Sequence, residues 1–135
     1  MRVQKLRITE SQWREMENHV ERAVPFEACG LIAGQRERVT KIIPVRNQAE
    51  SPVRFVMDPY EQLKAFQWMD DNHLDLLGIF HSHPTGPETA SPVDIAEAAY
   101  EVIQVILSRN KIEWTARGFW IEHGESLEVP IEIIE

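Results

Sequence analysis

The sequence is short of cysteine, and this limits both its cross-links and its metal sites. Cys29 is the single cysteine among 135 residues. One cysteine cannot form an intramolecular disulfide, and by itself it cannot build a cysteine-rich structural zinc site. A chain without disulfides suits a reducing compartment, so the sequence predicts a cytoplasmic protein.

Long apolar runs and an excess of basic side chains are also missing. No apolar stretch approaches the roughly 18 residues that indicate a membrane-spanning helix, and the N-terminal residues MRVQKLRITE do not have the pattern of a secretion signal. The 22 acidic side chains outnumber the 14 basic ones, which gives a formal net charge of −8. Such a chain offers no positive stripe for phosphates, so we expect neither nucleic acid nor a membrane as a partner; the acidity suits a basic protein surface.

What is present fits one α/β domain that spans residues 1–135, because a chain of this length supports one core and would support two only marginally. Apolar periodicity predicts a first helix with Thr9 or Ser11 as its cap and apolar positions from Trp13 to Val24. The same signals predict helices over 59–73 and 92–101. Apolar runs predict strands over 3–8, 28–34, 39–45, 54–58, 74–80 and 102–108, then a hairpin or meander over 112–134 with turns at 117–118 and 123–125. Together these elements predict one curved mixed sheet flanked by helices.

The segment GIFHSHPTGPETASPVD, from Gly78 to Asp94, carries the strongest sign of a site. His81 and His83 are separated by one residue, so in an extended chain both side chains point to the same side and can bind one ion. Pro84 restricts the backbone directly after them. We expect the pair to lie on the loop that leaves the 74–80 strand.

Asp94 would complete a set of metal ligands. Two imidazoles and one carboxylate leave the fourth position of a tetrahedral zinc ion open, which is typical of a catalytic site. An ordinary capping box, with Ser91 at the N-cap, Pro92 at the first helical position and Asp94 at the third, needs no metal. The two interpretations are compatible, because the cap would also orient Asp94 toward the histidines. We interpret the other histidines as surface or capping side chains: His19, His73 and His123.

Hydrolysis at such a site also needs a group that accepts a proton. Among the acidic residues Glu27 stands out, because it directly precedes the apolar run 28–32, where partial burial would raise its pKa into a useful range. The alternative is that Glu27 marks the solvated start of that strand, and the residues alone leave both open. Cys29 is a further candidate as a nucleophile or ligand, but its apolar neighbours predict an inert core thiol.

The pattern Pro25-x-Glu27-x-Cys29-Gly30-Leu31, then His81-x-His83-Pro84, six residues and Ser91-x-x-Asp94, resembles the JAMM (MPN+) metalloprotease family. Asn47, Phe55 and the helix start at Asp58-Pro59 extend the resemblance to compact prokaryotic members. It implies a cytidine-deaminase-like MPN fold in which His81, His83 and Asp94 bind one zinc ion, with a water as the fourth ligand. It also implies that Glu27 is the general base and that Ser91 donates a hydrogen bond to the oxyanion.

The resemblance implies a zinc-dependent hydrolase that cleaves isopeptide or peptide bonds at the C-terminal tail of a ubiquitin-like or sulfur-carrier protein. A tail of this kind would bind beside the metal by adding to a sheet edge. The short segment after Asp94 has no room for the ligand-bearing insertion of linkage-selective eukaryotic deubiquitinases. The same ligands would also accept iron or cobalt.

Other interpretations of the chain involve no catalysis or a different zinc-dependent reaction. A non-catalytic MPN-type scaffold, or a binding module for a ubiquitin-like partner, would need neither a metal nor Glu27. A deaminase-type zinc site would need a Cys-x-x-Cys pair, which the chain lacks. The sequence leaves open the oligomeric state, the type of bond that is cut, and whether the 47–52 loop gates the site.

Overall fold

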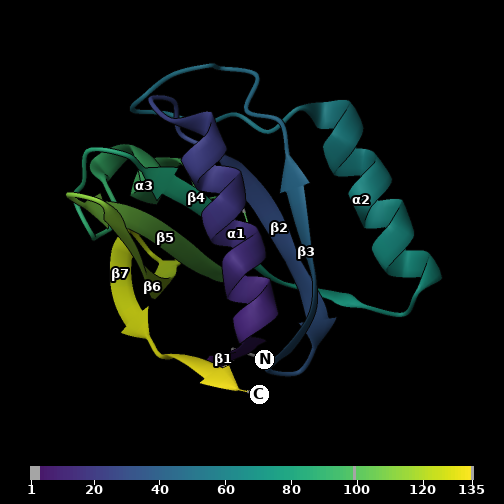
Figure 1. Ribbon diagram of the computed structural model, residues 1–135. Coiled ribbons are helices and arrows are strands. Elements are labelled where there is room, and N and C mark those ends of the chain that lie inside the picture. The colour runs from purple at the N-terminus through teal and green to yellow at the C-terminus, as the bar shows by residue number, and fades with distance from the viewer. Residues whose placement is uncertain (1–3, 99, 135) are drawn as a thin grey trace.

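One sheet runs through the chain in the computed structural model, which describes residues 4–98 and 100–134 (Figure 1). Its eight strands lie in the order β7-β6-β5-β4-β2-β3-β1-β8. The strands are β1 (Leu6–Thr9), β2 (Cys29–Gln35), β3 (Arg38–Val45), β4 (Asp75–His83), β5 (Ile103–Asn110), β6 (Glu113–Glu122), β7 (Glu125–Val129) and β8 (Ile131–Ile134). The helices are α1 (Glu10–Ala23), α2 (Pro59–Asp71) and α3 (Pro92–Glu97).

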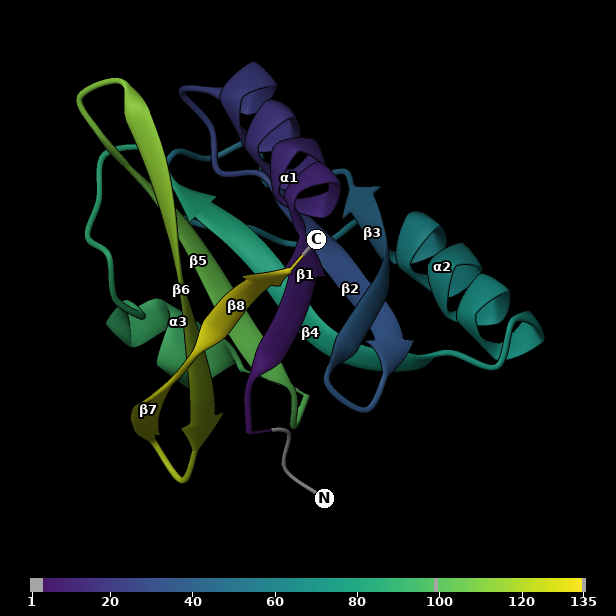
Figure 2. The ribbon, with the colours of Figure 1, turned by 60° about the horizontal axis from the view of Figure 1, so that its bottom comes forward.

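The sheet is mixed and curved, as predicted. Strand β4 runs parallel to β5, and β1 runs parallel to both β3 and β8, while the remaining neighbours are antiparallel. Figure 2 shows β8 lying between β1 and the β6–β7 hairpin. Strands β6 and β8 are also in contact, so the curvature brings the two ends of the sheet toward each other.

The two faces of the sheet carry different helices, and strand β4 contributes to both. Phe80 packs on the α1 side, in the cluster that holds Met16 and Val20. Ile79 points the other way, into the cluster with Met69 of α2. Helix α3 covers the same face further along, where Ile95 and Ala98 pack against Ile106 of β5. Successive side chains of a strand alternate between faces, so His81 and His83 share the α2–α3 side with Ile79.

The helix starts agree with the predicted caps. Thr9 is the N-cap of α1 in a capping box with Gln12, and Asp58 caps α2, with Pro59 at its first position. Helix α3 ends at Glu97, short of the predicted residue 101. None of the helices in the described residues combines the length and the apolarity that crossing a bilayer requires.

The prediction of a strand over 54–58 is wrong. The pairing there is an isolated bridge between Asn47 and Met57. The Asn47 side chain accepts the Val56 N–H and donates to the Arg54 carbonyl, so a side chain replaces the neighbouring strand for these backbone groups.

The C-terminal region differs from the predicted meander in two respects. Arg117 and Gly118 lie inside β6 and make no turn; a β-carbon at Gly118 would crowd the Val129 carbonyl, so the glycine allows β7 to approach closely. Strand β8 then leaves the hairpin and pairs with β1 at the opposite end of the sheet. The turn predicted at 123–125 is present, with positive φ at His123 and Gly124. Residue 3 of the predicted first strand lies outside the described residues.

Candidate metal and catalytic site

The two histidines end β4 and lie within the strand, so the prediction that they occupy the loop after it is wrong. His81 is 1% exposed and His83 is 4% exposed, because β4 lies between β2 and β5 at the centre of the sheet. Their Nε2 atoms are 3.1 Å apart. The alternation expected from the sequence therefore holds, and the strand brings both nitrogens to one point.

Neighbouring groups fix the orientation of both imidazole rings. His83 Nδ1 lies 2.7 Å from the Pro87 carbonyl oxygen, which can only accept, so Nδ1 carries the hydrogen. In the neutral ring the lone pair is then on Nε2, the atom that faces the site. The His81 ring stacks on Phe55, with ring centroids 4.5 Å apart and an angle of 26° between the planes.

Asp94 reaches both histidines from the first turn of α3. Its Oδ1 lies 3.1 Å from His81 Nε2, and its Oδ2 lies 3.0 Å from His83 Nε2. The capping box is present as well: Ser91 Oγ accepts the Asp94 N–H at 3.0 Å, and Asp94 Oδ2 accepts the Ser91 N–H at 2.9 Å. The cap thus orients the carboxylate toward the histidines, as the compatible interpretation expects.

Glu27 faces the histidine pair from two residues before β2. It is 4% exposed, and its Oε2 lies 4.0 Å from His83 Nε2. Its Oε1 is buried and has no hydrogen-bond partner among residues 4–98 and 100–134. Glu27 is therefore not the solvated start of a strand, and one of its oxygens remains available to accept a hydrogen bond inside the site.

Backbone contacts on both sides of Glu27 hold it in place. Its N–H donates to the Ser51 carbonyl at 2.8 Å, and its carbonyl accepts from Asn47 Nδ2 at 2.9 Å. The next residue, Ala28, donates its N–H to Ser82 Oγ at 2.8 Å and accepts the Ser82 N–H at 3.0 Å. Ser82, between the two histidines, thus ties the start of β2 to the end of β4.

The electrostatics of the site differ between its two carboxyl groups. Burial raises the pKa of Glu27 to about 7, although the nearby His83 opposes part of this shift. Burial also disfavours the charged form of Asp94, but hydrogen bonds to His81 and His83 outweigh it and hold the pKa of Asp94 well below its usual range. Asp94 is thus a permanent anion facing two imidazole nitrogens, which is an arrangement that attracts a cation.

The donor atoms have a spacing that fits a metal ion. Ligands about 2.0–2.1 Å from a tetrahedral zinc ion lie about 3.3 Å from one another. The two Nε2 atoms and the Asp94 oxygens are 3.0–3.1 Å apart. One ligand atom from each of Glu27, His81 and His83 also lies within 4.8 Å of the other two. This buried group can hold a metal ion.

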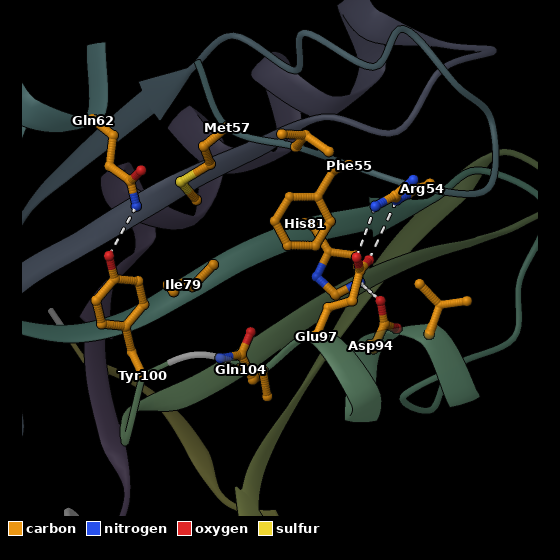
Figure 3. Close-up of a pocket in the computed structure, with 13 residues that line it drawn as sticks. Arg54, Phe55, Met57, Gln62, Ile79, His81, Asp94, Glu97, Tyr100 and Gln104 are labelled. Carbon is orange, nitrogen blue, oxygen red and sulfur yellow. Dashed lines mark hydrogen bonds and ion pairs between the residues drawn. The ribbon is translucent and has the colours of Figure 1, made fainter. Parts of the chain in front are cut away.

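A pocket of about 310 Å³ adjoins the site on the α2–α3 face of the sheet (Figure 3). Its floor is formed by Ile79, His81 and Gln104, one wall by residues 54–57, and the other by α3. Glu27 lies outside this pocket and lines a separate hollow with residues such as Phe26.

Two side-chain bridges cross the pocket (Figure 3). Arg54 donates to both carboxylate oxygens of Glu97, at 2.8 and 3.3 Å. Gln62 Nε2 donates to the Tyr100 hydroxyl at 3.3 Å. Both bridges join the region between β3 and the first turns of α2 to the region that follows Asp94.

The remaining sequence candidates lie apart from the chemistry. Cys29 is fully buried, its thiol donates to the Val45 carbonyl at 3.4 Å, and burial raises its pKa to about 12, so it is the inert core thiol that its neighbours predict. His19 is half-buried and donates to the Cys29 carbonyl. His73 and His123 are exposed, at turn positions with positive φ.

Comparison with known proteins agrees with this geometry. Residues 9–120 match the family described as prokaryotic homologs of the JAB domain. A probable TtuB-protein conjugate cleaving protease of Thermus thermophilus is 37% identical over 118 residues, which cover 87% of this chain and 76% of the relative. A desampylase of Pyrococcus furiosus is 44% identical over 109 residues, with 79% and 76% covered. A CysO-cysteine peptidase of Mycobacterium tuberculosis is 31% identical over 121 residues, with 87% and 83% covered.

Solved structures give the same fold. A protein from Desulfitobacterium hafniense, 34% identical, matches with a TM-score of 0.88 over 96% of this chain and 93% of its own. A JAB1/MPN domain protein from Archaeoglobus fulgidus, 18% identical, matches with a TM-score of 0.59 over 96% of this chain and 100% of its own. The second similarity bears on the fold alone.

Proposed function

Because this chain belongs to the prokaryotic homologues of the JAB domain, we propose that it is a zinc-dependent protease acting on the C-terminal tail of a ubiquitin-like or sulfur-carrier protein. The bond it cuts is an isopeptide or peptide bond. The resemblance to the JAMM (MPN+) family that the sequence motifs indicated is confirmed by this match and by the named relatives.

One observation carries the proposal: four side chains from three separate parts of the chain meet in one buried place. His81 and His83 come from β4, Asp94 from α3 and Glu27 from two residues before β2. Burying two carboxylates and two imidazoles costs free energy that a purely structural core would avoid. A set of this kind marks a functional site.

In this proposal His81, His83 and Asp94 are the zinc ligands. Two nitrogens and one oxygen leave a position open for water or substrate. When bound, zinc lowers the pKa of a water molecule and polarises the carbonyl that this water attacks. The chain supplies the orientation: the Pro87 carbonyl fixes the His83 ring, and Phe55 fixes the His81 ring.

Glu27 is the proposed general base. Its Oε2 is 4.0 Å from His83 Nε2, further than the Asp94 oxygens, so Glu27 lies one step outside the ligand set. That position allows it to hydrogen-bond a water beside the ligands. Glu27 then accepts the proton of the attacking water and transfers it to the departing nitrogen, which leaves as a neutral amine.

Ser91 is the proposed donor to the oxyanion. Its Oγ accepts the Asp94 N–H, and its own hydroxyl hydrogen has no partner among the described residues. The hydroxyl can therefore cap the helix and donate to the substrate carbonyl oxygen at the same time. Removing a comparable donor in other hydrolases costs about 2.7–4 kcal/mol of transition-state stabilisation.

The proposed substrates follow from the named relatives. One is a protease for TtuB-protein conjugates, another a desampylase and a third a CysO-cysteine peptidase. By these names the relatives cleave conjugates in which a carrier protein is joined to another protein or to cysteine. The carrier's tail is the part that all these substrates have in common, and we propose that the enzyme binds it. A non-catalytic scaffold or a bare binding module would not need Glu27 and the ligand set in one buried place.

The test measures intact masses of carrier proteins after incubation with the purified enzyme. The panel contains ubiquitin-like and sulfur-carrier proteins with a lysine conjugate or a C-terminal adduct. We expect loss of one type of conjugate or adduct, with Glu27→Gln lowering the rate about 100-fold or more while zinc content stays at the wild-type value. Removal of the metal with a chelator should abolish the reaction.

Glu15→Gln is the matched control, because Glu15 is an exposed carboxylate on α1 far along the chain from the site. It should cleave at the wild-type rate. A wild-type sample that contains zinc and leaves the whole panel intact would contradict the proposed substrates. A sample that takes up no zinc at all would favour the scaffold.

A further inference from the structure

Gln104 is a polar side chain on the floor of the pocket, in a strand that is otherwise apolar around it. It is 6% exposed, and its neighbours in β5 are the buried Ile103 and Val105. A buried carboxamide without hydrogen bonds costs free energy, because it has two N–H donors and an oxygen acceptor to satisfy. The position therefore calls for a reason that packing does not supply.

The carboxamide of Gln104 has no hydrogen bond to any of the residues 4–98 and 100–134 that the structure describes. Its atoms are not sealed in the core either, because they border the open space of the pocket. In the view of Figure 3 Gln104 lies among the residues that line the pocket, near Ile79 and between Tyr100 and Glu97. The carboxamide is thus one of the polar groups that line the pocket, with no partner among the described residues.

The sheet register places Gln104 at a defined distance from the histidines. Gln104 is the partner of Ile79, and Ile106 is the partner of His81, so the carboxamide is two residues along the strand from the proposed metal ligand. Two residues of strand span roughly 7 Å, and two residues of an extended substrate span about the same length.

The pocket lies on the acyl side of the bond to be cut. Glu27 must reach the departing nitrogen, and it lines a hollow separate from the pocket. His81 and Asp94, two of the proposed ligands, line the pocket itself. A substrate whose carbonyl carbon is at the ligands, with its nitrogen toward Glu27, extends its acyl chain over Ile79 and Gln104.

We propose that Gln104 is a substrate-binding residue whose carboxamide hydrogen-bonds a backbone peptide group of the acyl chain, about two residues before the scissile bond. The inference rests on the proposed function and adds to it a specific contact. An extended backbone offers one N–H and one C=O per residue, and a carboxamide can match both. The neighbouring side chains Phe55, Met57 and Ile79 are apolar and cannot hydrogen-bond a peptide group, whereas the Gln104 amide can.

The test compares two substrates with the same scissile bond. One has a four-residue acyl chain ending in Gly-Gly, and the other has acetylglycine, which is too short to reach Gln104. Gln104→Met keeps the length of the side chain and removes its hydrogen bonds. We expect kcat/KM for the long substrate to fall about tenfold, mainly through KM, and kcat/KM for the short substrate to stay at the wild-type value. Gln67→Met, at an exposed position on α2, is the matched control and should change neither.

A second measurement separates contact from structure. An ester replaces the peptide group of the long substrate about two residues before the scissile bond, which removes its N–H. The ester should weaken cleavage by the wild type and have no further effect on Gln104→Met. Equal losses on the long and short substrates, or full activity of Gln104→Met on both, would overturn the proposal.

If the wild type cleaves neither substrate, the proposed function fails on these peptides and Gln104 is judged by binding. Isothermal titration of zinc-loaded protein with the four-residue tail as a free acid should then give a Kd about tenfold weaker for Gln104→Met than for the wild type. Equal affinities, or no binding to the wild type, would overturn the inference.

Discussion

At the scale of single residues, Ser91 has an observed capping role and a proposed catalytic role, which substitution can separate. Its Oγ caps α3, and its hydroxyl hydrogen is free to donate to substrate. We expect Ser91→Ala to lower kcat about 100- to 1,000-fold through loss of the oxyanion donor, and to destabilise the protein by about 1 kcal/mol through loss of the cap. Steady-state kinetics and thermal unfolding measure the two effects.

Ser91→Gly distinguishes the tasks, because glycine at an N-cap costs only a few tenths of a kcal/mol. The Gly variant should regain most of the stability and none of the lost kcat. Ser91→Thr, which keeps the hydroxyl, should retain both. Recovery of kcat in the Gly variant would mean that Ser91 acts only as a cap.

The residues of the site could be predicted from the sequence more completely than the residues of the pocket. Spacing predicted that His81 and His83 point to one side of an extended segment, and the capping pattern oriented Asp94 toward them. The structure brings these side chains together. Their roles as ligands stay predictions. Gln104 could not be found this way, because one glutamine in an apolar strand does not reveal which face it occupies or that a pocket lies there.

At the scale of elements, the segment between β3 and α2 is organised by one side chain. Asn47 donates to the carbonyls of Glu27 and Arg54 and accepts from the N–H groups of Ala49 and Val56. It therefore joins the proposed general base to the wall of the pocket. The apolar residues of the sequence suggested a strand over 54–58. Such a pattern does not reveal that the Asn47 side chain takes the place of a partner strand.

Loss of the Asn47 side chain should therefore affect stability and activity together. We expect Asn47→Ala to lower the free energy of unfolding by about 2–4 kcal/mol, since four hydrogen bonds are lost at roughly 0.5–1.5 kcal/mol each and the segment relaxes in part. It should also lower kcat, because Glu27 loses a backbone contact. Denaturant unfolding and steady-state kinetics measure both.

The neighbouring Gln48→Ala is the control for Asn47→Ala, because Gln48 is exposed. It should leave stability and kcat at the wild-type values. If Asn47→Ala unfolds at the wild-type denaturant concentration, the hydrogen bonds of Asn47 do not organise the segment.

At the scale of the whole molecule, the proposed metal site joins β4 to α3. Helix α3 has only six residues, so a metal ion would add to the contacts that hold it on the sheet. An ion that binds only the folded chain stabilises it by mass action. We expect zinc at about 100 times its Kd to raise the melting temperature by about 10 °C, corresponding to about 2.7 kcal/mol. Thermal unfolding with and without a chelator measures the shift.

Asp94→Asn should lose most of this zinc-dependent shift while the amide oxygen still accepts the Ser91 N–H. Glu101→Gln, the same change at an exposed carboxylate, should keep the full shift. An unchanged shift in Asp94→Asn would remove Asp94 from the ligand set.

The architecture of the whole chain could be predicted as α/β with a curved mixed sheet because periodicity and caps are local signals. The pairing of β8 with β1 could not, because it joins strands from opposite ends of the sequence. The predicted strand ended at residue 80, whereas β4 continues to His83. Histidine is usually found at least partly exposed, so its presence suggested that the buried strand had ended. Here both histidines are buried because they belong to the site.

The alternation of β4 has a consequence for the fidelity of folding. His81 and His83 face Asp94 on α3, while Ser82 between them faces the opposite side and bonds the backbone of Ala28. A β4 that slipped by one residue against β2 would aim a single hydroxyl at Asp94 and bury two imidazoles in the α1 core. A zinc ion held by the proposed ligands would bind only chains in the native register, so it would also select correctly folded molecules.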